Sequence, residues 1–375
     1  MKKYIAHVSP SLGRILCSAF LTLTLSAHAH PVLHTPEITK QPEQKQAWCI
    51  LGNRDTAYAL ADACGKKTIP CTVMTRSTQR TQKFFKRHKS VVVTKGEATK
   101  KDDILRACQG CSYLYLGQTF PYDKNWSKNI NAMVDAAIEV SKETGVIIIY
   151  PGRIYKYGTQ TPIREDSREQ PTSHHGHVFA QVERKLEACK HTNVMQEDLS
   201  AGFKARIIRH SYPYGPATGP LIADSVKGIL QNRHRSWWQS AADFKWFGDT
   251  SKPVQLTSTE NFASFVLTYT KSLCPTAFDS INYPGHTFSS IDAFAQIVFQ
   301  QAQGEAGTVH VYTPFKLKIA AKMGDTSAQQ ALDVHDMFNG VLLDGGKQQK
   351  LFGNLTYLTP EEAVKNTITW YQQNH

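Results

Sequence analysis

The chain of 375 residues is 41% hydrophobic and 20% charged, a balance typical of an ordinary soluble globular protein. Its length suits one large domain or a domain with a smaller lobe, and the absence of internal repeats and low-complexity segments excludes a repeat architecture. The formal net charge of +12 favours contact with anionic ligands or surfaces. Because the basic residues are scattered, apart from the KFFKRHK segment at 83–89, we expect no specific nucleic-acid binding.

Residues 1–29 have the features of a secretory signal peptide. Basic residues precede an apolar run at 15–25, and the AHA sequence at 27–29 supplies the small residues that a signal peptidase accepts. The run of about 11 residues is shorter than the roughly 20 that a membrane-spanning helix needs. We therefore expect no transmembrane segment, cleavage before His30, and export to the periplasm or the medium. An uncleaved interfacial anchor is the alternative.

The mature chain would begin with a polar, proline-containing segment at 30–45, which we expect to be a flexible leader. Cleavage removes Lys2, Lys3 and Arg14 from the net charge of +12 and leaves about +9. A basic mature protein still favours anionic ligands or surfaces.

Seven of the eight cysteines follow the predicted signal peptide, and an odd number leaves at least one thiol without a partner in an oxidising compartment. Cys108 and Cys111 form a CxxC at the end of a predicted helix. Redox motifs of this spacing begin a helix instead, where its dipole lowers the thiol pKa, so we interpret this pair as structural. Cys64 and Cys71 flank a predicted helix-to-strand turn and could close a small loop.

Short apolar segments alternate with helical ones from residue 46 to residue 209. The predicted strands are 46–52, 72–76, 90–94, 112–117, 146–150 and 204–209, and the predicted helices are 56–64, 101–108, 126–144 and 173–189. This alternation predicts a parallel sheet with helices on both faces. Right-handed crossovers make such an α/β sheet doubly wound and Rossmann-like.

After residue 212 the alternation loosens. We expect helices at 221–230, 260–271 and 290–301, a strand at 253–256 and a tryptophan-rich stretch at 237–248. A final helix at 360–373 has Thr359 as its N-cap and Pro360 at its first position. The chain therefore divides into a Rossmann-like domain at 46–212 and a smaller C-terminal substrate lobe at 213–375, which is interleaved with the last strands and helices.

Six segments occur in an order and spacing that one enzyme family shares. They are ILG at 50–52, GEATKKDDILRACQG at 96–110, IYKYG at 154–158, PIREDSREQPTS at 162–173, RHSYPYGP at 209–216 and TPEEAVKNTITWYQ at 359–372. Together they resemble the extended short-chain dehydrogenase/reductase superfamily, that is, the NAD-dependent epimerase/dehydratase family. The PYDKNW and YPGRIYKYG sequences resemble an atypical branch that lacks the usual tyrosine–lysine pair. The resemblance implies an NAD- or NADP-binding domain and, frequently, a homodimer.

The turn after the first strand, where the resemblance places the cofactor, reads GNRDTAY from Gly52. A dinucleotide needs glycines here, so that the backbone can approach the pyrophosphate at a helix N-terminus. Only Gly52 remains, and Asp55 adds an opposing negative charge. Arg54 and Arg76 could hold phosphates or be solvated surface residues, and Gly117 ends the fourth strand. We interpret the loop as degenerate, with a working site for NAD or NADP as the alternative.

The family transfers protons with a tyrosine and a lysine four residues later, next to a serine or threonine at the end of the fifth strand. Here the alignment places His175 at the tyrosine, Phe179 at the lysine and Arg153 near the serine. Phenylalanine cannot donate a hydrogen bond, so the usual mechanism is absent. His175 could be a general acid/base and Arg153 could position an anion, or the histidines could simply lie exposed at a helix start. No second ligand group accompanies them, and we expect no metal site.

Two functions remain open from the sequence. The first is an exported, epimerase-like protein that binds a small, anionic molecule without ordinary catalysis. The second is an active atypical NAD(P)-dependent oxidoreductase or epimerase that acts on a sugar-like or small carbonyl substrate through His175 and Arg153.

Overall fold

A computed structural model describes residues 46–191, 202–232, 243–272, 276–353, 355 and 357–374. The predicted signal peptide and leader lie outside these residues, as do Cys274 and part of the tryptophan-rich stretch. In the described part of the chain, no helix has both the length and the apolar character needed to cross a membrane.

A seven-stranded parallel sheet forms the centre of the described chain, in the spatial order β10-β6-β5-β4-β1-β2-β3. Its strands are β1 (Trp48–Leu51), β2 (Cys71–Thr75), β3 (Val91–Lys95), β4 (Tyr113–Leu116), β5 (Ile147–Arg153), β6 (Lys204–His210) and β10 (Phe278–Tyr283). The chain builds outward from β1 to β3, returns to β4, and then builds outward on the other side. The predicted doubly wound, Rossmann-like sheet is confirmed, and its order reverses between β1 and β4.

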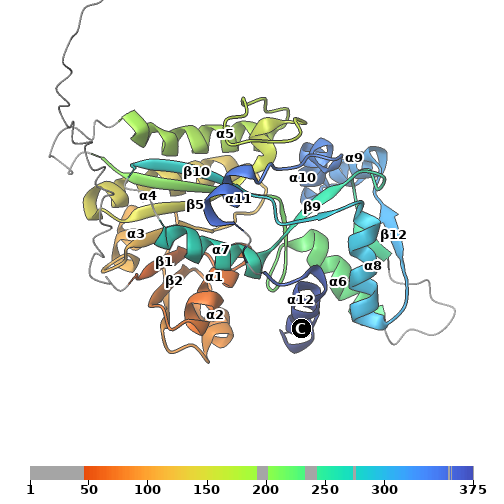
Figure 1. Ribbon diagram of the computed structural model, residues 1–375, viewed down its shortest axis with the longest axis horizontal. Coiled ribbons are helices and arrows are strands. Elements are labelled where there is room, and N and C mark those ends of the chain that lie inside the picture. The colour runs from red at the N-terminus through yellow and green to blue at the C-terminus, as the bar shows by residue number, and fades with distance from the viewer. Residues whose placement is uncertain are drawn as a thin grey trace, which may run out of the picture. The chain divides into compact units, whose positions relative to one another are not determined.

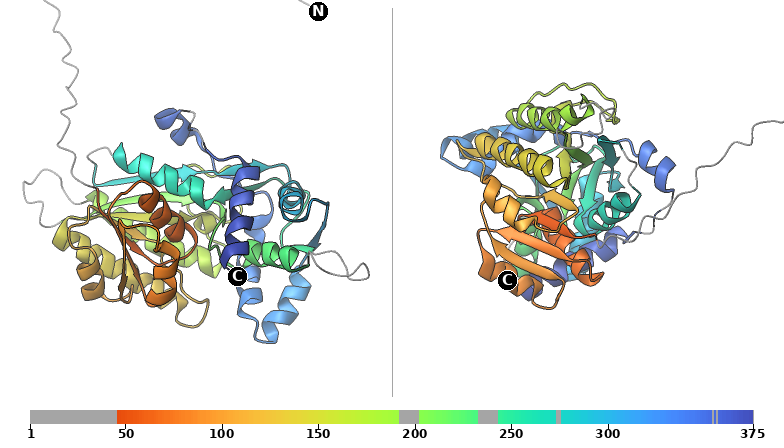
Figure 2. Two further views of the ribbon diagram at one scale, coloured as in Figure 1. Left: turned by 90° about the horizontal axis from the view of Figure 1, so that it is seen from below. Right: turned by 90° about the vertical axis from the view of Figure 1, so that its left-hand side faces the viewer.

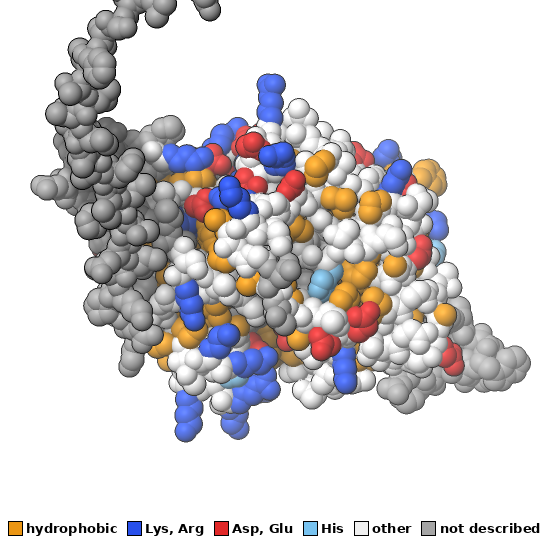
Figure 3. Space-filling view, in the orientation of Figure 1, with side chains coloured by type: hydrophobic (Ala, Val, Ile, Leu, Met, Phe, Trp, Pro, Cys, Tyr) orange, Lys and Arg blue, Asp and Glu red, His pale blue; other side chains and the backbone are white. Residues whose placement is uncertain are grey.

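Helices cover both faces of this sheet because its central strands are buried on both sides. One face packs against α1 (Asp55–Lys66) and α7 (Thr259–Lys271), and the other packs against α3 (Lys101–Ala107), α4 (Trp126–Thr144) and α5 (His174–Glu187). The end-on view in Figure 2 shows these two helical layers. The remaining helix of this half is α2 (Thr78–Phe85), whose last three residues are the first three of the KFFKRHK segment. Basic side chains gather over α2 in Figure 3.

The rest of the C-terminal half forms a lobe beside the carboxyl ends of the strands (Figure 1). Its strands are β7 (Tyr212–Tyr214), β8 (Asp243–Trp246), β9 (Val254–Ser258), β11 (His286–Phe288) and β12 (Thr308–Val311). Its helices are α6 (Pro220–Asn232), α8 (Ile291–Gln303), α9 (Pro314–Lys322), α10 (Thr326–Val334) and α12 (Pro360–Asn374), whereas α11 (Gly346–Phe352) packs against β10 and α7 of the large sheet. Three single turns of 3-10 helix complete the fold, η1 (Ile154–Tyr157), η2 (Ala188–His191) and η3 (His335–Phe338).

Local sequence signals explain how two of the helices begin. The Ser173 hydroxyl accepts a hydrogen bond from the Gly176 N–H at the start of α5. At the start of α12, the Thr359 hydroxyl accepts from the Glu362 N–H, and the Glu362 carboxylate accepts from the Thr359 N–H. This reciprocal pair is a capping box, and it confirms Thr359 as the N-cap.

Candidate functional site

Gly52 and Gly117 bring the turn after β1 and the end of β4 into contact at the point where the strand order reverses. Gly52 has a φ of +97°, and a Cβ there would lie 2.8 Å from the Gln118 Cα. A Cβ on Gly117 would lie 2.7 Å from the Cβ of Ala57 in α1. Only glycine fits either position without a shift of the backbone or its neighbours.

Asp55, the first residue of α1, joins this turn to the loop that follows β7. Its backbone N–H donates to the Ala217 carbonyl at 3.1 Å, and its Oδ1 accepts from the Gly219 N–H at 2.6 Å. The side chain is 7% exposed, and its φ of +49° is unusual for a residue with a side chain. Burial raises the pKa of this carboxyl, against the opposing influence of Arg153 and the Gly219 N–H.

The N-terminus of α1, where the fold would place the pyrophosphate of a dinucleotide, carries an acidic side chain. A phosphate at a helix N-terminus needs open N–H groups and a favourable field, whereas a buried carboxylate lies at the first residue of α1. Arg54 is exposed and its side chain makes no capping hydrogen bond, while exposed Arg76 lies 3.9 Å from Glu97. The structure thus places both arginines at the solvent surface, Arg54 in the turn after β1 and Arg76 directly after β2.

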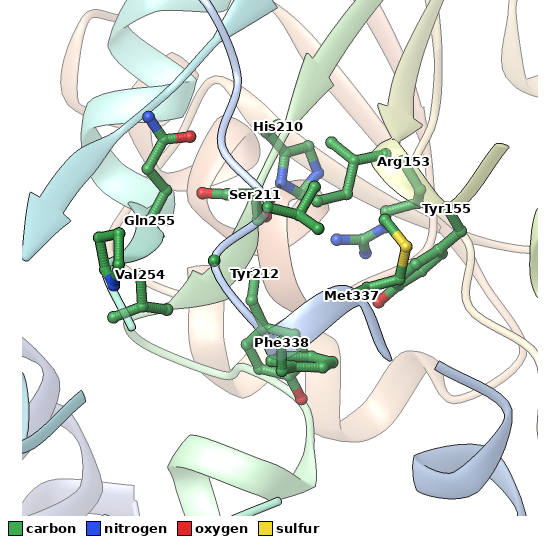
Figure 4. Close-up of a pocket in the computed structure, with 13 residues that line it drawn as sticks. Arg153, Tyr155, His210, Ser211, Tyr212, Val254, Gln255, Met337 and Phe338 are labelled. Atoms are coloured by element: carbon green, nitrogen blue, oxygen red, sulfur yellow. Dashed lines mark hydrogen bonds between the residues drawn. The ribbon is translucent and has the colours of Figure 1, made fainter. Parts of the chain in front are cut away.

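A small cavity lies where β5 and β6 end against the C-terminal lobe. Its volume is about 30 Å³, and its walls include Arg153, Tyr155, His210, Gln255 and Phe338. Figure 4 shows the Arg153 guanidinium and the Tyr155 ring directed into the same space, with Met337 of η3 drawn beside them. Pockets that enclose a whole small-molecule ligand usually have volumes of about 300 Å³ or more. This cavity therefore admits only a small chemical group.

Arg153 is half-buried at the end of β5. Among the residues that the structure describes, no carboxylate lies within ion-pair distance of its guanidinium, and the Tyr155 hydroxyl likewise has no hydrogen-bonding partner. Burial raises the pKa of Tyr155, so its phenol stays protonated and able to donate. Two donors therefore face a cavity that is otherwise lined largely by apolar side chains.

His210 completes the polar wall in its neutral form. It is 1% exposed, and its Nδ1 lies 2.7 Å from the Ser211 carbonyl oxygen, which requires a proton on Nδ1. Its Nε2 is buried and has no partner within the described chain. Burial and the neighbouring Arg153 lower the pKa of His210 well below its usual value, so it adds no positive charge at neutral pH.

His175 lies outside this cavity, in an aromatic cluster on the other side of Tyr155. Its ring stacks on Tyr122 with centroids 4.5 Å apart and packs against Trp126 at 4.3 Å, and only 2% of the residue is exposed. Its Nδ1 lies 2.5 Å from Oδ2 of Asp333 in α10. The histidine is therefore neither exposed at the helix start nor within the same cavity as Arg153.

Asp333 is the residue that sequence reasoning missed at this position. Besides the imidazole, its carboxylate accepts hydrogen bonds from the backbone N–H groups of His174 and His175, both at 2.8 Å. Asp333 thus caps α5 from the C-terminal lobe, 158 residues along the chain. Burial lowers the pKa of His175 in spite of this carboxylate, so a neutral imidazole donates to a charged acceptor.

A cluster of buried charged residues packs against η1 and connects it to α5 and β6. Glu183 of α5 is fully buried and lies 2.9 Å from both the Lys156 Nζ and an Arg209 nitrogen. The Lys156 and Arg209 cations also lie over the Tyr157 ring, at 5.1 and 5.5 Å. Phe179, at the expected lysine position, packs between Tyr155 and His175 and contributes no polar group.

The chain is similar to known proteins in its structure, but not in its sequence. No sequence-family model and no curated protein sequence matches the chain. The UDP-glucose 4-epimerase from Bifidobacterium longum, in complex with NAD+ and UDP, superposes with a TM-score of 0.68 at 13% identity, covering 88% of this chain and 99% of its own. The UDP-glucuronic acid 4-epimerase from Bacillus cereus, with UDP-glucuronic acid and NAD, gives 0.66 at 12%, covering 88% and 100%.

The dTDP-glucose 4,6-dehydratase from Bacillus anthracis, in complex with NAD, also gives a TM-score of 0.66 at 12% identity, covering 88% of this chain and 97% of its own. These likenesses span the sheet and the C-terminal lobe alike. The chain therefore has the Rossmann-like fold of the NAD-dependent epimerases and dehydratases to which it is structurally similar.

Proposed function

We propose that the mature protein is an exported binding protein, built on an epimerase fold, that holds a small anionic group at Arg153. The observation that carries this proposal is the half-buried Arg153 guanidinium, which faces a cavity without a counter-ion. A planar guanidinium matches a carboxylate in a two-point hydrogen bond, and the protonated Tyr155 phenol adds a third donor. A partly desolvated cation without a carboxylate in ion-pair distance in the described part of the chain is stabilised by such an anion.

The size of the cavity limits which chemical groups can enter it. Its volume of about 30 Å³ holds two or three water-sized groups. A carboxylate fits, whereas a whole sugar ring or nicotinamide ring does not. We infer that the carboxylate enters as the end group of a larger molecule, with the rest outside the cavity or admitted by movement of η3.

The dinucleotide of the structural relatives is a separate question. Those relatives are complexes with NAD, which supports testing NAD and NADP here. The Asp55 carboxylate at the first residue of α1 opposes pyrophosphate binding, and Phe179 in place of lysine removes the usual ribose and proton-transfer contact. We propose that neither dinucleotide binds in the pose of the relatives. A homodimer stays a prediction.

Isothermal titration calorimetry of the mature protein tests the proposal with small carboxylates, including acetate, lactate and glucuronate, and with NAD, NADH, NADP and NADPH. At least one carboxylate should bind, and Arg153→Gln should weaken it at least tenfold. Arg76→Gln, at an exposed arginine outside the cavity, should leave the affinity unchanged. Dinucleotide binding tighter than about 100 μM, roughly −5.5 kcal/mol, would overturn the reasoning from Asp55.

A second candidate function is supported by the contact between His175 and Asp333. An imidazole whose Nδ1 donates to a carboxylate is held in the tautomer with an accepting Nε2, as general bases require. If a dinucleotide binds, this dyad supports an atypical NAD(P)-dependent oxidoreductase or epimerase. His175→Gln would then abolish turnover but retain cofactor affinity, and unchanged turnover would remove His175 from the mechanism.

Export is the other part of the proposal, and it rests on the sequence at 1–29. N-terminal sequencing of the protein from the periplasm or medium should begin at His30. Recovery of Met1 at the N-terminus of the exported protein would show that the signal peptide is not cleaved.

A further inference from the structure

Four cysteines form two buried pairs, one on each face of the N-terminal half of the sheet. Cys64 of α1 and Cys71, the first residue of β2, lie in the apolar layer beneath α1 and α7. Cys49 of β1 and Cys108, at the end of α3, lie in the layer beneath α3 and α4. All four are buried, and all four are free thiols in the structure.

Strand register separates the pairs. Cys71 is level with Trp48, and Cys49 is level with Thr72. Because successive side chains point to opposite faces of a sheet, Cys49 and Cys71 face away from each other, although they lie on neighbouring strands. Cys64 and Cys71 therefore share one face, and Cys49 and Cys108 share the other, where the partly buried Cys111 also packs.

Within each pair the two side chains are close enough to be hydrogen-bonding partners, Cys64 with Cys71 and Cys49 with Cys108. The backbone holds them there, since the Cys64 carbonyl accepts from the Ile69 N–H at 2.9 Å in the connecting turn. A disulfide needs the two sulfurs to approach to about 2.05 Å.

We propose that the exported protein carries two structural disulfides, Cys64–Cys71 and Cys49–Cys108, and that Cys111 of the CxxC remains a thiol. The Cys111 Sγ contacts the Ala107 carbonyl oxygen at 3.8 Å, while Cys108 is paired with Cys49 on the sheet. The proposal takes only the oxidising compartment from the proposed function. The thiols lie near the amino ends of their strands, at the opposite edge of the sheet from Arg153.

Each bond forms by exchange with a disulfide oxidant, such as glutathione disulfide or an exported dithiol oxidase. Two cysteine thiols lose two electrons and two protons in total, and the oxidant's disulfide is reduced to two thiols. Because hydrogen bonding to the partner thiol, together with burial, raises the pKa of Cys49 and Cys71 in the folded protein, exchange takes place in the partly folded chain, where thiolates are accessible.

Tryptic mapping after oxidative refolding in a glutathione redox buffer tests both bonds in the wild-type mature protein. Cleavage after Lys66 and Lys67 separates Cys64 from Cys71, so that bond should join peptide 55–66 to peptide 68–76. The other bond should join peptide 46–54 to peptide 107–124, which contains both Cys108 and Cys111. Both joined species should disappear on reduction, and the urea midpoint should fall.

Two variants assign the sulfur in the second bond. Cys111→Ser should retain the link between peptides 46–54 and 107–124, whereas Cys108→Ser should lose it. A bond within peptide 107–124, or full alkylation of Cys49 and Cys64 after refolding, would overturn the proposal. Carboxylate binding at Arg153 in the same preparation is an independent readout, so the two proposals can fail separately.

Discussion

The junction between α5 and α10 depends on Asp333, and Asp333→Ala tests it. The substitution removes the acceptor for two backbone N–H groups at the start of α5 and for the His175 Nδ1–H. Loss of a helix cap costs about 1 kcal/mol, and a buried imidazole N–H left without an acceptor costs about 1–3 kcal/mol. We expect the free energy of unfolding at neutral pH to fall by about 2–4 kcal/mol.

The pH dependence of this loss has a defined sign. Hydrogen bonds from His175 and the two backbone N–H groups outweigh burial and lower the pKa of Asp333. Its contribution to stability is therefore present above its unfolded pKa and is lost as the pH falls through the folded one. The difference between wild type and Asp333→Ala should be largest near neutrality and should shrink below about pH 4.

Urea unfolding followed by tryptophan fluorescence measures this difference, because the Trp126 ring lies 4.3 Å from the His175 ring. Asp336→Ala is a matched control, since that carboxylate is 70% exposed and lies three residues further along the same lobe. The wild type should lose further stability below about pH 6.5, because burial lowers the pKa of His175. A loss below 0.5 kcal/mol, or one equal to that of Asp336→Ala, would refute the reasoning.

Three substitutions test other parts of the frame by urea unfolding. Gly52→Ala should lower the free energy of unfolding by about 1–3 kcal/mol, because φ is +97° and the added Cβ would lie 2.8 Å from a backbone atom. An unchanged urea midpoint would contradict this close contact. Glu183→Gln removes the fully buried carboxylate that Lys156 and Arg209 share and should lower the free energy of unfolding by about 3–5 kcal/mol, and a neutral result would mean that Glu169 and Glu187 compensate the two cations. Thr359→Ala should cost about 1 kcal/mol through loss of the capping box, and no loss would show that Glu362 suffices alone.

Most of the sheet was predictable because its central strands are uniform apolar runs bounded by polar turns. Six of its seven strands were expected within a few residues of their observed bounds. The seventh, β10, was missed since its sequence FDSINY mixes polar and apolar residues, as suits an edge strand whose first half is only partly buried. The polar helix α2 was missed for a similar reason, because only two of its eight residues are buried.

The sequence predicts where individual residues of the candidate site lie, but not which distant residues they contact. The positions of Arg153 and Gly52 follow from where their strands end, and Phe179 follows from its spacing in α5. The partners of these residues do not, because they come from distant segments. Asp333 lies 158 residues after His175, and Gly219 lies 164 residues after Asp55. No periodicity within one element encodes such a pairing.

The charges at the carboxyl ends of β1 and β5 explain where an anion would bind in this fold. A dinucleotide site directs the open N-terminus of the first helix toward two phosphate charges. Here that helix begins with a buried carboxylate, whose Oδ1 is already occupied by the Gly219 N–H. The Arg153 cation, which has no carboxylate within ion-pair distance among the described residues, lies instead at the end of β5, two strands away from β1 in the sheet and so about 10 Å along its edge. The end of β5, rather than the turn after β1, is therefore the position that favours an anion, and a carboxylate at Arg153 is the ligand that we propose for it.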